Sequence, residues 1–174
     1  MRLHIKSLVM DPEVEVIDNF LPSDEFKKIE SHLLDDDFTW NWNKGILDDD
    51  DPPGSYQFTH AFFMNGKLSD SDLLKPCMYK LGCKTLVRVK SNLNTRTVFH
   101  RNGGYHRDNS SFGFDMKVAL LYINTNNGCT KIKGYGKVKC VANRLVRFNS
   151  YVEHAGISCT DKKRKVVLNF NYHE

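Results

Sequence analysis

The chain has 174 residues and a mass of 20.1 kDa, a size typical of a single domain. Hydrophobic residues make up 40% of the sequence and charged residues 26%, so a core can form and disorder is not expected. No apolar run approaches the roughly 18 residues that cross a bilayer. The first six residues, MRLHIK, also lack the apolar stretch of a secretory signal. These features exclude a membrane protein and a secreted mini-protein.

The cysteine pattern and the charge distribution indicate the compartment and the kind of partner. The five cysteines are odd in number and form no CxxC pair, which favours free thiols in a reducing, cytoplasmic compartment over disulfides or a zinc ribbon. Residues 1–75 carry a net charge of −9 and residues 76–174 a net charge of +13. Either an acidic layer packs beside a basic core, or a basic cleft attracts an anionic molecule, an acidic partner or nucleic acid.

The N-terminal part of the chain predicts short strands and one helix. Two strands are expected at 2–9 and 13–17, separated by the turn residues Asp11 and Pro12. Apolar residues then recur at helical spacing over 24–34, and Ser23 precedes them as a plausible N-cap.

An acidic loop follows this helix. Residues 43–57 contain Asp48–Asp51 and then Pro-Pro-Gly, a composition that predicts an irregular surface loop. The aromatic residues on either side leave a second interpretation open, in which the loop is a lid over a substrate. A second helix is expected near 70–82, interrupted or restarted at Pro76.

From Thr85 onward the pattern changes from helix to strand. Short segments rich in β-branched residues alternate with glycine- and asparagine-containing turns. The expected strands are 86–90, 97–100, 117–123, 136–141, 144–148 and 165–170. Two helices followed by many short strands predict an α+β protein whose strands form a sandwich or a barrel, without an internal repeat or a second domain.

Three residues have the composition of a metal site. His106 and Asp108 are two positions apart, and on an extended backbone such residues point to the same side. His154 lies farther along the chain. Two imidazoles and one carboxylate form the facial triad that binds non-haem Fe(II). The alternative for His154 taken alone is a structural histidine.

Two further residues are candidates for binding an anionic co-substrate. Arg164 begins a strand in which Val166, Leu168 and the following alternate residues share an apolar face, and a guanidinium at such a position needs an anionic partner. Tyr122 could donate its hydroxyl to the same carboxylate. The alternatives are a surface arginine and an ordinary core tyrosine.

These residues stand in motifs that resemble the Fe(II)/2-oxoglutarate-dependent dioxygenases, particularly the prolyl 4-hydroxylase-like group and its short single-domain forms in phages and microbes. The motifs are YHRDN around the first two ligands, LYINTNNG, NRLVRFNS and VVLNFNY. The resemblance covers 80–174 most strongly and extends loosely to the VIDNFLP stretch. Collagen-modifying members carry Lys where this chain has Arg164, which points to the hypoxia-factor or microbial type.

The resemblance implies a fold and a reaction. Residues 1–174 would form one dioxygenase domain, a double-stranded β-helix (jelly-roll) barrel at 83–174 with N-terminal strands and helices at 1–82 packed on one face. His106, Asp108 and His154 would hold Fe(II), while Arg164 and Tyr122 would bind the distal carboxylate of 2-oxoglutarate. O₂ would be the second co-substrate and ascorbate an accessory reductant. The expected products are succinate, CO₂ and a hydroxylated protein or peptide, with proline as the residue expected to be modified.

Two alternative functions follow from the same residues. The charge of 76–174 could serve oxidative demethylation of nucleic acid, although that branch usually carries a second arginine after the one matching Arg164, and 166–174 contains none. A non-catalytic jelly-roll binding module is the other alternative. On the strand 86–90, Arg88 and Lys90 share a face, which either lines the active-site mouth or, as we expect, forms the solvated side of an edge strand.

Overall fold

The computed structural model describes residues 12–46, 51, 55–108 and 115–174. The strand expected at 2–9 and most of the acidic run therefore lie outside the described residues. Within the described part, neither helix is long and apolar enough to cross a membrane. All five cysteines are free, as the sequence predicted.

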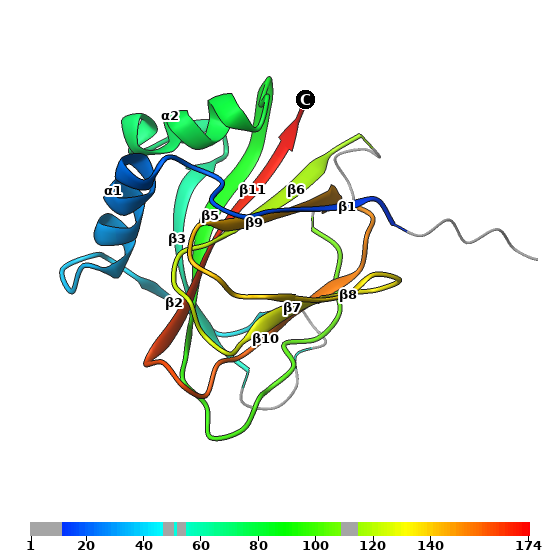
Figure 1. Cartoon of the computed structure of the whole chain (residues 1–174). Helices are drawn as coiled ribbons and strands as arrows, with labels where there is room; N and C mark the ends of the chain where they lie inside the picture. Colours follow the sequence, from blue (N-terminus) through cyan, green and yellow to red (C-terminus); the bar gives the residue numbers. More distant parts are fainter. Residues whose placement is uncertain (1–11, 47–50, 52–54, 109–114) are drawn as a thin grey trace, which may run out of the picture.

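The larger of two antiparallel sheets forms the frame of the molecule (Figure 1). It has the strand order β1-β9-β6-β11-β5-β3-β2, with β4 paired to β3. Its strands are β1 (Val14–Ile17), β2 (Asn41–Asn43), β3 (Gln57–Met64), β4 (Lys67–Leu68), β5 (Thr85–Thr95), β6 (Lys117–Tyr122), β9 (Arg144–Asn149) and β11 (Arg164–His173). Because β11 lies between β6 and β5, it is a central strand, and strands from both ends of the chain share the sheet.

The smaller sheet faces the larger one and has the order β10-β7-β8. Its strands are β7 (Cys129–Ile132), β8 (Gly136–Lys139) and β10 (His154–Ile157). The segment 102–106 runs along the free side of β10, where it makes two isolated antiparallel bridges. Two antiparallel sheets with two helices in the described residues are consistent with the jelly-roll fold that the resemblance implies.

The alternation of side chains on β11 divides the interior into two regions. Val166, Leu168, Phe170 and Tyr172 belong to one hydrophobic cluster, which also contains buried residues of helices α1 (Ser23–Leu34) and α2 (Ser71–Lys80). The intervening residues face the space between the two sheets, part of which a second hydrophobic cluster fills. The helices therefore lie on the outer side of the large sheet, as Figure 1 shows.

Three local expectations are wrong. Pro22, not Ser23, occupies the N-cap position of α1, and no side chain caps the helix. Pro76 lies inside α2 without ending it, although an interior proline removes one backbone hydrogen bond and its ring crowds the carbonyl four residues earlier. The segment 97–100 is not a strand. Instead the Thr97 hydroxyl donates to the Phe99 carbonyl (2.7 Å), which folds the segment into a turn.

Candidate metal centre and co-substrate pocket

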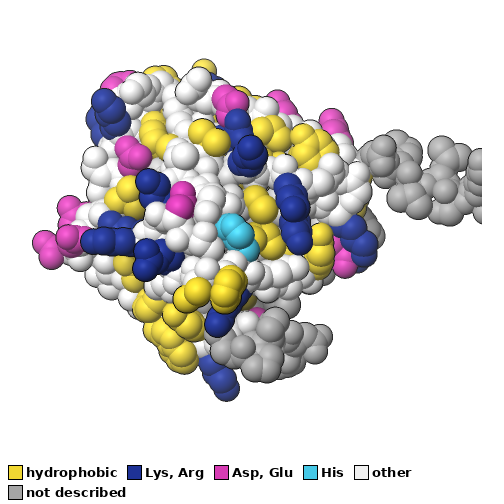
Figure 2. All heavy atoms as spheres, turned by 60° about the horizontal axis from the view of Figure 1, so that its bottom comes forward, with side chains coloured by type: hydrophobic (Ala, Val, Ile, Leu, Met, Phe, Trp, Pro, Cys, Tyr) yellow, Lys and Arg dark blue, Asp and Glu magenta, His cyan; other side chains and the backbone are white. Residues whose placement is uncertain are grey.

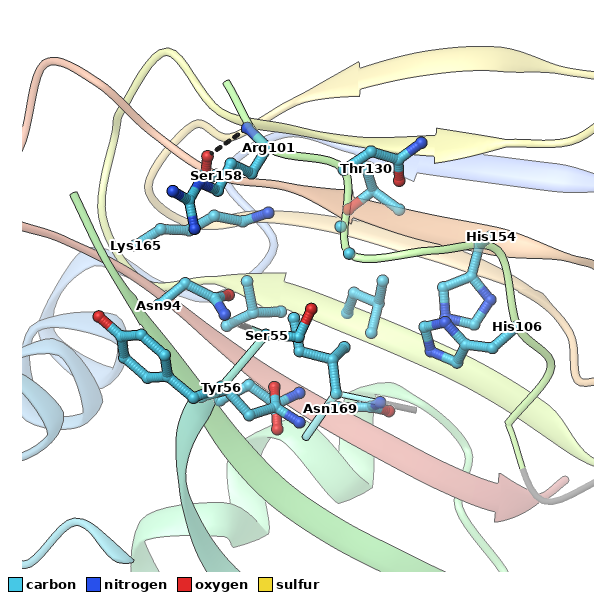
Figure 3. Close-up of a pocket in the computed structure, with 18 of the residues that line it drawn as sticks. Ser55, Tyr56, Asn94, Arg101, His106, Thr130, His154, Ser158, Lys165 and Asn169 are labelled. Atoms are coloured by element: carbon cyan, nitrogen blue, oxygen red, sulfur yellow. Dashed lines mark hydrogen bonds between the residues drawn. The ribbon is translucent and has the colours of Figure 1, made fainter. Parts of the chain in front are cut away.

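A cavity of about 390 Å³ lies between the two sheets and contains the predicted metal ligands (Figure 3). One wall comes from β5 and β11 of the large sheet, and the other comes from β7, β10 and the segment 97–106. Figure 2 shows the face that lies at the bottom of Figure 1, where Lys, Arg and hydrophobic side chains are interspersed. Thr97 lines the cavity, and the next two residues, Val98 and Phe99, are 85% and 79% exposed.

The structure brings the three predicted ligands together. His106, Asp108 and His154 each offer a ligand atom, and these atoms lie within 4.8 Å of one another. Nε2 of His106 is 3.5 Å from Oδ1 of Asp108, and the two imidazole rings are 4.5 Å apart between centroids. Residues 48 positions apart in the chain thus form one group.

The backbone explains why the two histidines are neighbours. His106 and His154 are directly opposite each other in an antiparallel bridge, and each backbone N–H donates to the other residue's carbonyl at 3.0 Å. The Nδ1 atoms lie near the carbonyls of Gly104 (3.3 Å) and Val152 (3.2 Å). A proton on Nδ1 that serves these carbonyls leaves Nε2 with a free lone pair for a metal.

The carboxylate of Asp108 is held by a network of polar side chains. Its Oδ2 accepts hydrogen bonds from Nδ2 of Asn169 (2.7 Å) and of Asn171 (3.1 Å). The guanidinium of Arg88 lies 3.4 Å from the same oxygen. Asp108 itself is 5% exposed. The network thus engages one carboxylate oxygen and leaves the other beside His106.

The electrostatic environment prepares both buried ligands for a cation. Burial alone would raise the pKa of Asp108, but the charges of His154 and Arg88 and the hydrogen bond from Asn169 outweigh it and hold the pKa well below its ordinary value. Burial lowers the pKa of His154, against the opposing effect of Asp108. Both pKa values are thus lowered, which favours a charged carboxylate and an imidazole that readily gives up its proton to a metal, the forms that coordinate metals.

A buried lysine lies deeper in the same cavity. Lys165 is 2% exposed, and its Nζ donates to the carbonyls of Ile157 (2.9 Å) and Cys129 (3.1 Å). An ammonium group has three N–H donors, so one remains for a ligand in the cavity. Figure 3 shows the side chain extending along the cavity wall toward Thr130. Sequence reasoning missed this residue.

Tyr122 reaches the cavity only through Thr130. Tyr122 is fully buried in the second hydrophobic cluster, and its hydroxyl donates to Oγ1 of Thr130 at 2.8 Å. Thr130 lines the cavity, whereas Tyr122 does not. Since Oγ1 of Thr130 already accepts a proton from the tyrosine, its own hydroxyl proton is available to a ligand.

Arg164 lies outside the cavity. Its guanidinium donates to the backbone carbonyl of Leu34 at the end of α1, on the side of the sheet that carries the helices. The expectation that it opens an apolar face is correct, but that face packs against the helices and not around the cavity. The next residue, Lys165, points into the cavity.

Arg88 and Lys90 also differ from expectation. Their strand β5 is not an edge strand, because it pairs with both β11 and β3. Lys90 lines the cavity, and Arg88 contacts Asp108. The alternation of charged and apolar residues correctly predicted that Arg88 and Lys90 share a face. The sequence did not show that β5 pairs with a strand on each side.

Comparisons with known proteins place this arrangement in context. No protein-family model and no curated protein matches the sequence. Among solved structures, the epimerase SnoN in complex with Fe3+, alpha ketoglutarate and nogalamycin RO has a TM-score of 0.65 at 11% identity, covering 94% of this chain and 80% of that chain. A Pseudomonas putida prolyl-4-hydroxylase has a TM-score of 0.58 at 17% identity and covers 94% of both chains.

A viral enzyme adds a third comparison. The collagen prolyl hydroxylase of Paramecium Bursaria Chlorella virus-1 has a TM-score of 0.57 at 14% identity, covering 92% of this chain and 90% of that chain. At such identities a likeness establishes the fold alone. The chain has the fold of the 2-oxoglutarate- and iron-dependent oxygenases.

Proposed function

We propose that the chain is an Fe(II)- and 2-oxoglutarate-dependent dioxygenase that hydroxylates a peptidyl residue. The observation that carries the proposal is one cavity that holds the His106, Asp108 and His154 group together with the buried cation of Lys165. A metal site next to a site for a carboxylate is what an iron enzyme with a dicarboxylate co-substrate requires.

The residues present fit Fe(II). Two imidazole nitrogens and one carboxylate oxygen are the donor set of the facial triad. The hydrogen bonds of Asp108 and the Nδ1 contacts of both histidines orient these donors, as is usual around metal ligands. When bound, iron and 2-oxoglutarate together supply the activation of O₂, with succinate and CO₂ as products.

The residues around Lys165 fit a carboxylate. We assign the distal carboxylate of 2-oxoglutarate to Lys165 and Thr130, in place of Arg164 and Tyr122. The free N–H of Lys165 and the hydroxyl proton of Thr130 supply two donors, one of them charged. Tyr122 acts indirectly, because its hydrogen bond fixes the direction of the Thr130 hydroxyl.

The proposed substrate is a proline-containing peptide. Two proteins of the same fold are prolyl hydroxylases. Val98 and Phe99 follow the cavity-lining Thr97 and are exposed, and Tyr56 lines the cavity at 43% exposure. Exposed apolar side chains beside a deep polar cavity suit a chain that lies across the mouth and inserts one residue.

The test is co-substrate turnover with a peptide library. We expect succinate to form only with Fe(II), 2-oxoglutarate and O₂ present, and a proline-containing peptide to gain the mass of one oxygen. His106→Ala should reduce turnover to background, while His32→Ala, on the exposed side of α1, should not. Turnover that survives His106→Ala would refute the metal assignment. Succinate formation with oxygen transfer to nucleic acid and not to peptides would refute the substrate class alone.

A further inference from the structure

Arg88 and Asn171 form a polar pair directly beneath Asp108. The two residues are opposite each other in the pairing of β5 with β11, and Nε of Arg88 donates to Oδ1 of Asn171 at 2.9 Å. Asn171 is fully buried, and the Arg88 side chain is 18% exposed. Both therefore belong to the interior of two central strands, which are rigid elements for positioning a site.

This pair and Asn169 each direct one nitrogen to the same oxygen of Asp108. The Nδ2 groups of both asparagines donate to Oδ2, and Nη2 of Arg88 lies 3.4 Å from it. Nη2 is buried and makes no hydrogen bond to any other described residue. Its charge is thus directed at Asp108. By contrast, Oδ1 faces Nε2 of His106.

From this asymmetry we propose that Arg88, Asn169 and Asn171 are positioning residues that make Asp108 a one-oxygen metal ligand. An unrestrained carboxylate can turn to offer both oxygens to a cation. Here a turn of the carboxylate would break two hydrogen bonds and separate an ion pair in the interior, where unpaired groups are costly. Holding Oδ2 keeps a coordination position open for the co-substrate. The inference rests on the proposed metal site.

The contribution of Arg88 is not only its charge. A second cation near the site weakens metal binding by repulsion, so if charge alone mattered, removing it would strengthen binding. If the guanidinium instead holds the carboxylate, removing it weakens binding, because loss of a side chain that orients a metal ligand typically costs about 10–100-fold in affinity. The two roles therefore predict opposite changes in metal affinity when the Arg88 side chain is removed.

The experiment is a Co(II) titration of the metal-free full-length chain, followed by visible absorption. Co(II) reports affinity and coordination together, and it needs no turnover. We expect Arg88→Met to weaken binding about tenfold or more and to change the Co(II) spectrum. Arg88→Lys should not restore either property, because lysine keeps the charge but cannot contact Asn171 and Asp108 at once. Lys67→Met removes a charge from the exposed strand β4, outside the cavity, and should bind Co(II) within about twofold of the wild type.

A second variant covers the case in which Arg88→Met does not fold. Asn171→Val suits a strand and removes one donor to Asp108 and the acceptor for Arg88, and we expect the same direction of change. Wild-type affinity and spectrum in Arg88→Met, or in Asn171→Val, would overturn the inference, as would an equal loss in Lys67→Met. A wild-type chain that binds no Co(II) would instead overturn the metal site itself and the proposed function with it.

Discussion

Arg164 and Lys165 are adjacent on β11, and their side chains lie on opposite faces of the large sheet. Lys165 enters the cavity and donates to two carbonyls there, whereas Arg164 contacts the end of α1. Two neighbouring cations thus have different surroundings, which makes each a control for the other.

Lys165→Met should weaken 2-oxoglutarate binding about 10–100-fold, since a hydrogen bond to a charged group contributes about 1.5–3 kcal/mol. Arg164→Met should leave this affinity unchanged, because its side chain is outside the cavity. Calorimetric titration of the Mn(II)-loaded protein with 2-oxoglutarate measures both. Loss of affinity in Arg164→Met and not in Lys165→Met would restore the assignment that the sequence suggested.

The hydroxyl pair predicts a graded effect. Thr130→Val removes the hydroxyl that faces the cavity and should weaken 2-oxoglutarate binding about tenfold. Tyr122→Phe removes only the hydrogen bond that orients this hydroxyl, so the expected loss is a few-fold. The same titration checks both variants. A larger loss in Tyr122→Phe than in Thr130→Val would mean that the tyrosine contacts the ligand directly.

The metal group was predictable from the sequence because its geometry is local. His106 and Asp108 share a side through the two-residue period of extended backbone, and His154 follows in a segment with few other ligands. Lys165, the residue that we propose binds the co-substrate, was not predictable in the same way. Lys165 is buried although it is charged, because β11 is central and covered on both faces. The sequence shows which residues of β11 share a face, but it does not show which of the two faces bounds the cavity.

Strand propensity also gave wrong predictions for a segment that does not pair as a strand and for a strand that is short. Residues 97–100 have the composition of a strand, but they bend after the cavity-lining Thr97. In contrast, β10 consists of His-Ala-Gly-Ile, whose small residues give little strand signal. It forms because β7 pairs with it along its full length. Strand partners are a property of the whole fold, so such segments cannot be assigned from their own residues.

Burial of two thiols predicts their reactivity. Burial raises the pKa of Cys77 to about 12 and that of Cys140 to about 11. A raised pKa lowers the thiolate fraction at any given pH, and the thiolate is the reactive form. At pH 8 we expect iodoacetamide to spare Cys77 and Cys140 in the folded chain and to label the half-buried Cys129 faster. Peptide mass spectrometry measures the sites, and all five should react in denaturant. Equal labelling of Cys77 in both states would contradict its burial.

Asn143 predicts a stability effect far from the cavity. Its side chain accepts a hydrogen bond from the Leu21 N–H and donates one to the Leu21 carbonyl, and its φ is +60°. Asn143→Ala should lower the free energy of unfolding by about 2–4 kcal/mol, since two buried bonds are lost and alanine is strained at this φ. Equilibrium unfolding in urea measures this change in the free energy of unfolding.

The control for this variant is Asn65→Ala. Asn65 has a similar φ of +51° but is exposed, so only the backbone strain should appear, about 1 kcal/mol. If both variants lose the same stability, the hydrogen bonds of Asn143 contribute nothing.

The backbone bridge between residues 106 and 154 has a consequence for the proposed iron site. In small zinc domains the cation itself organises the chain, and chelation unfolds it. Here both imidazoles are carried by peptide groups that are already bonded to each other. If the chain binds iron as proposed, removal of the ion by a chelator or after oxidation would leave the site intact, and resupply of the ion would refill it without refolding.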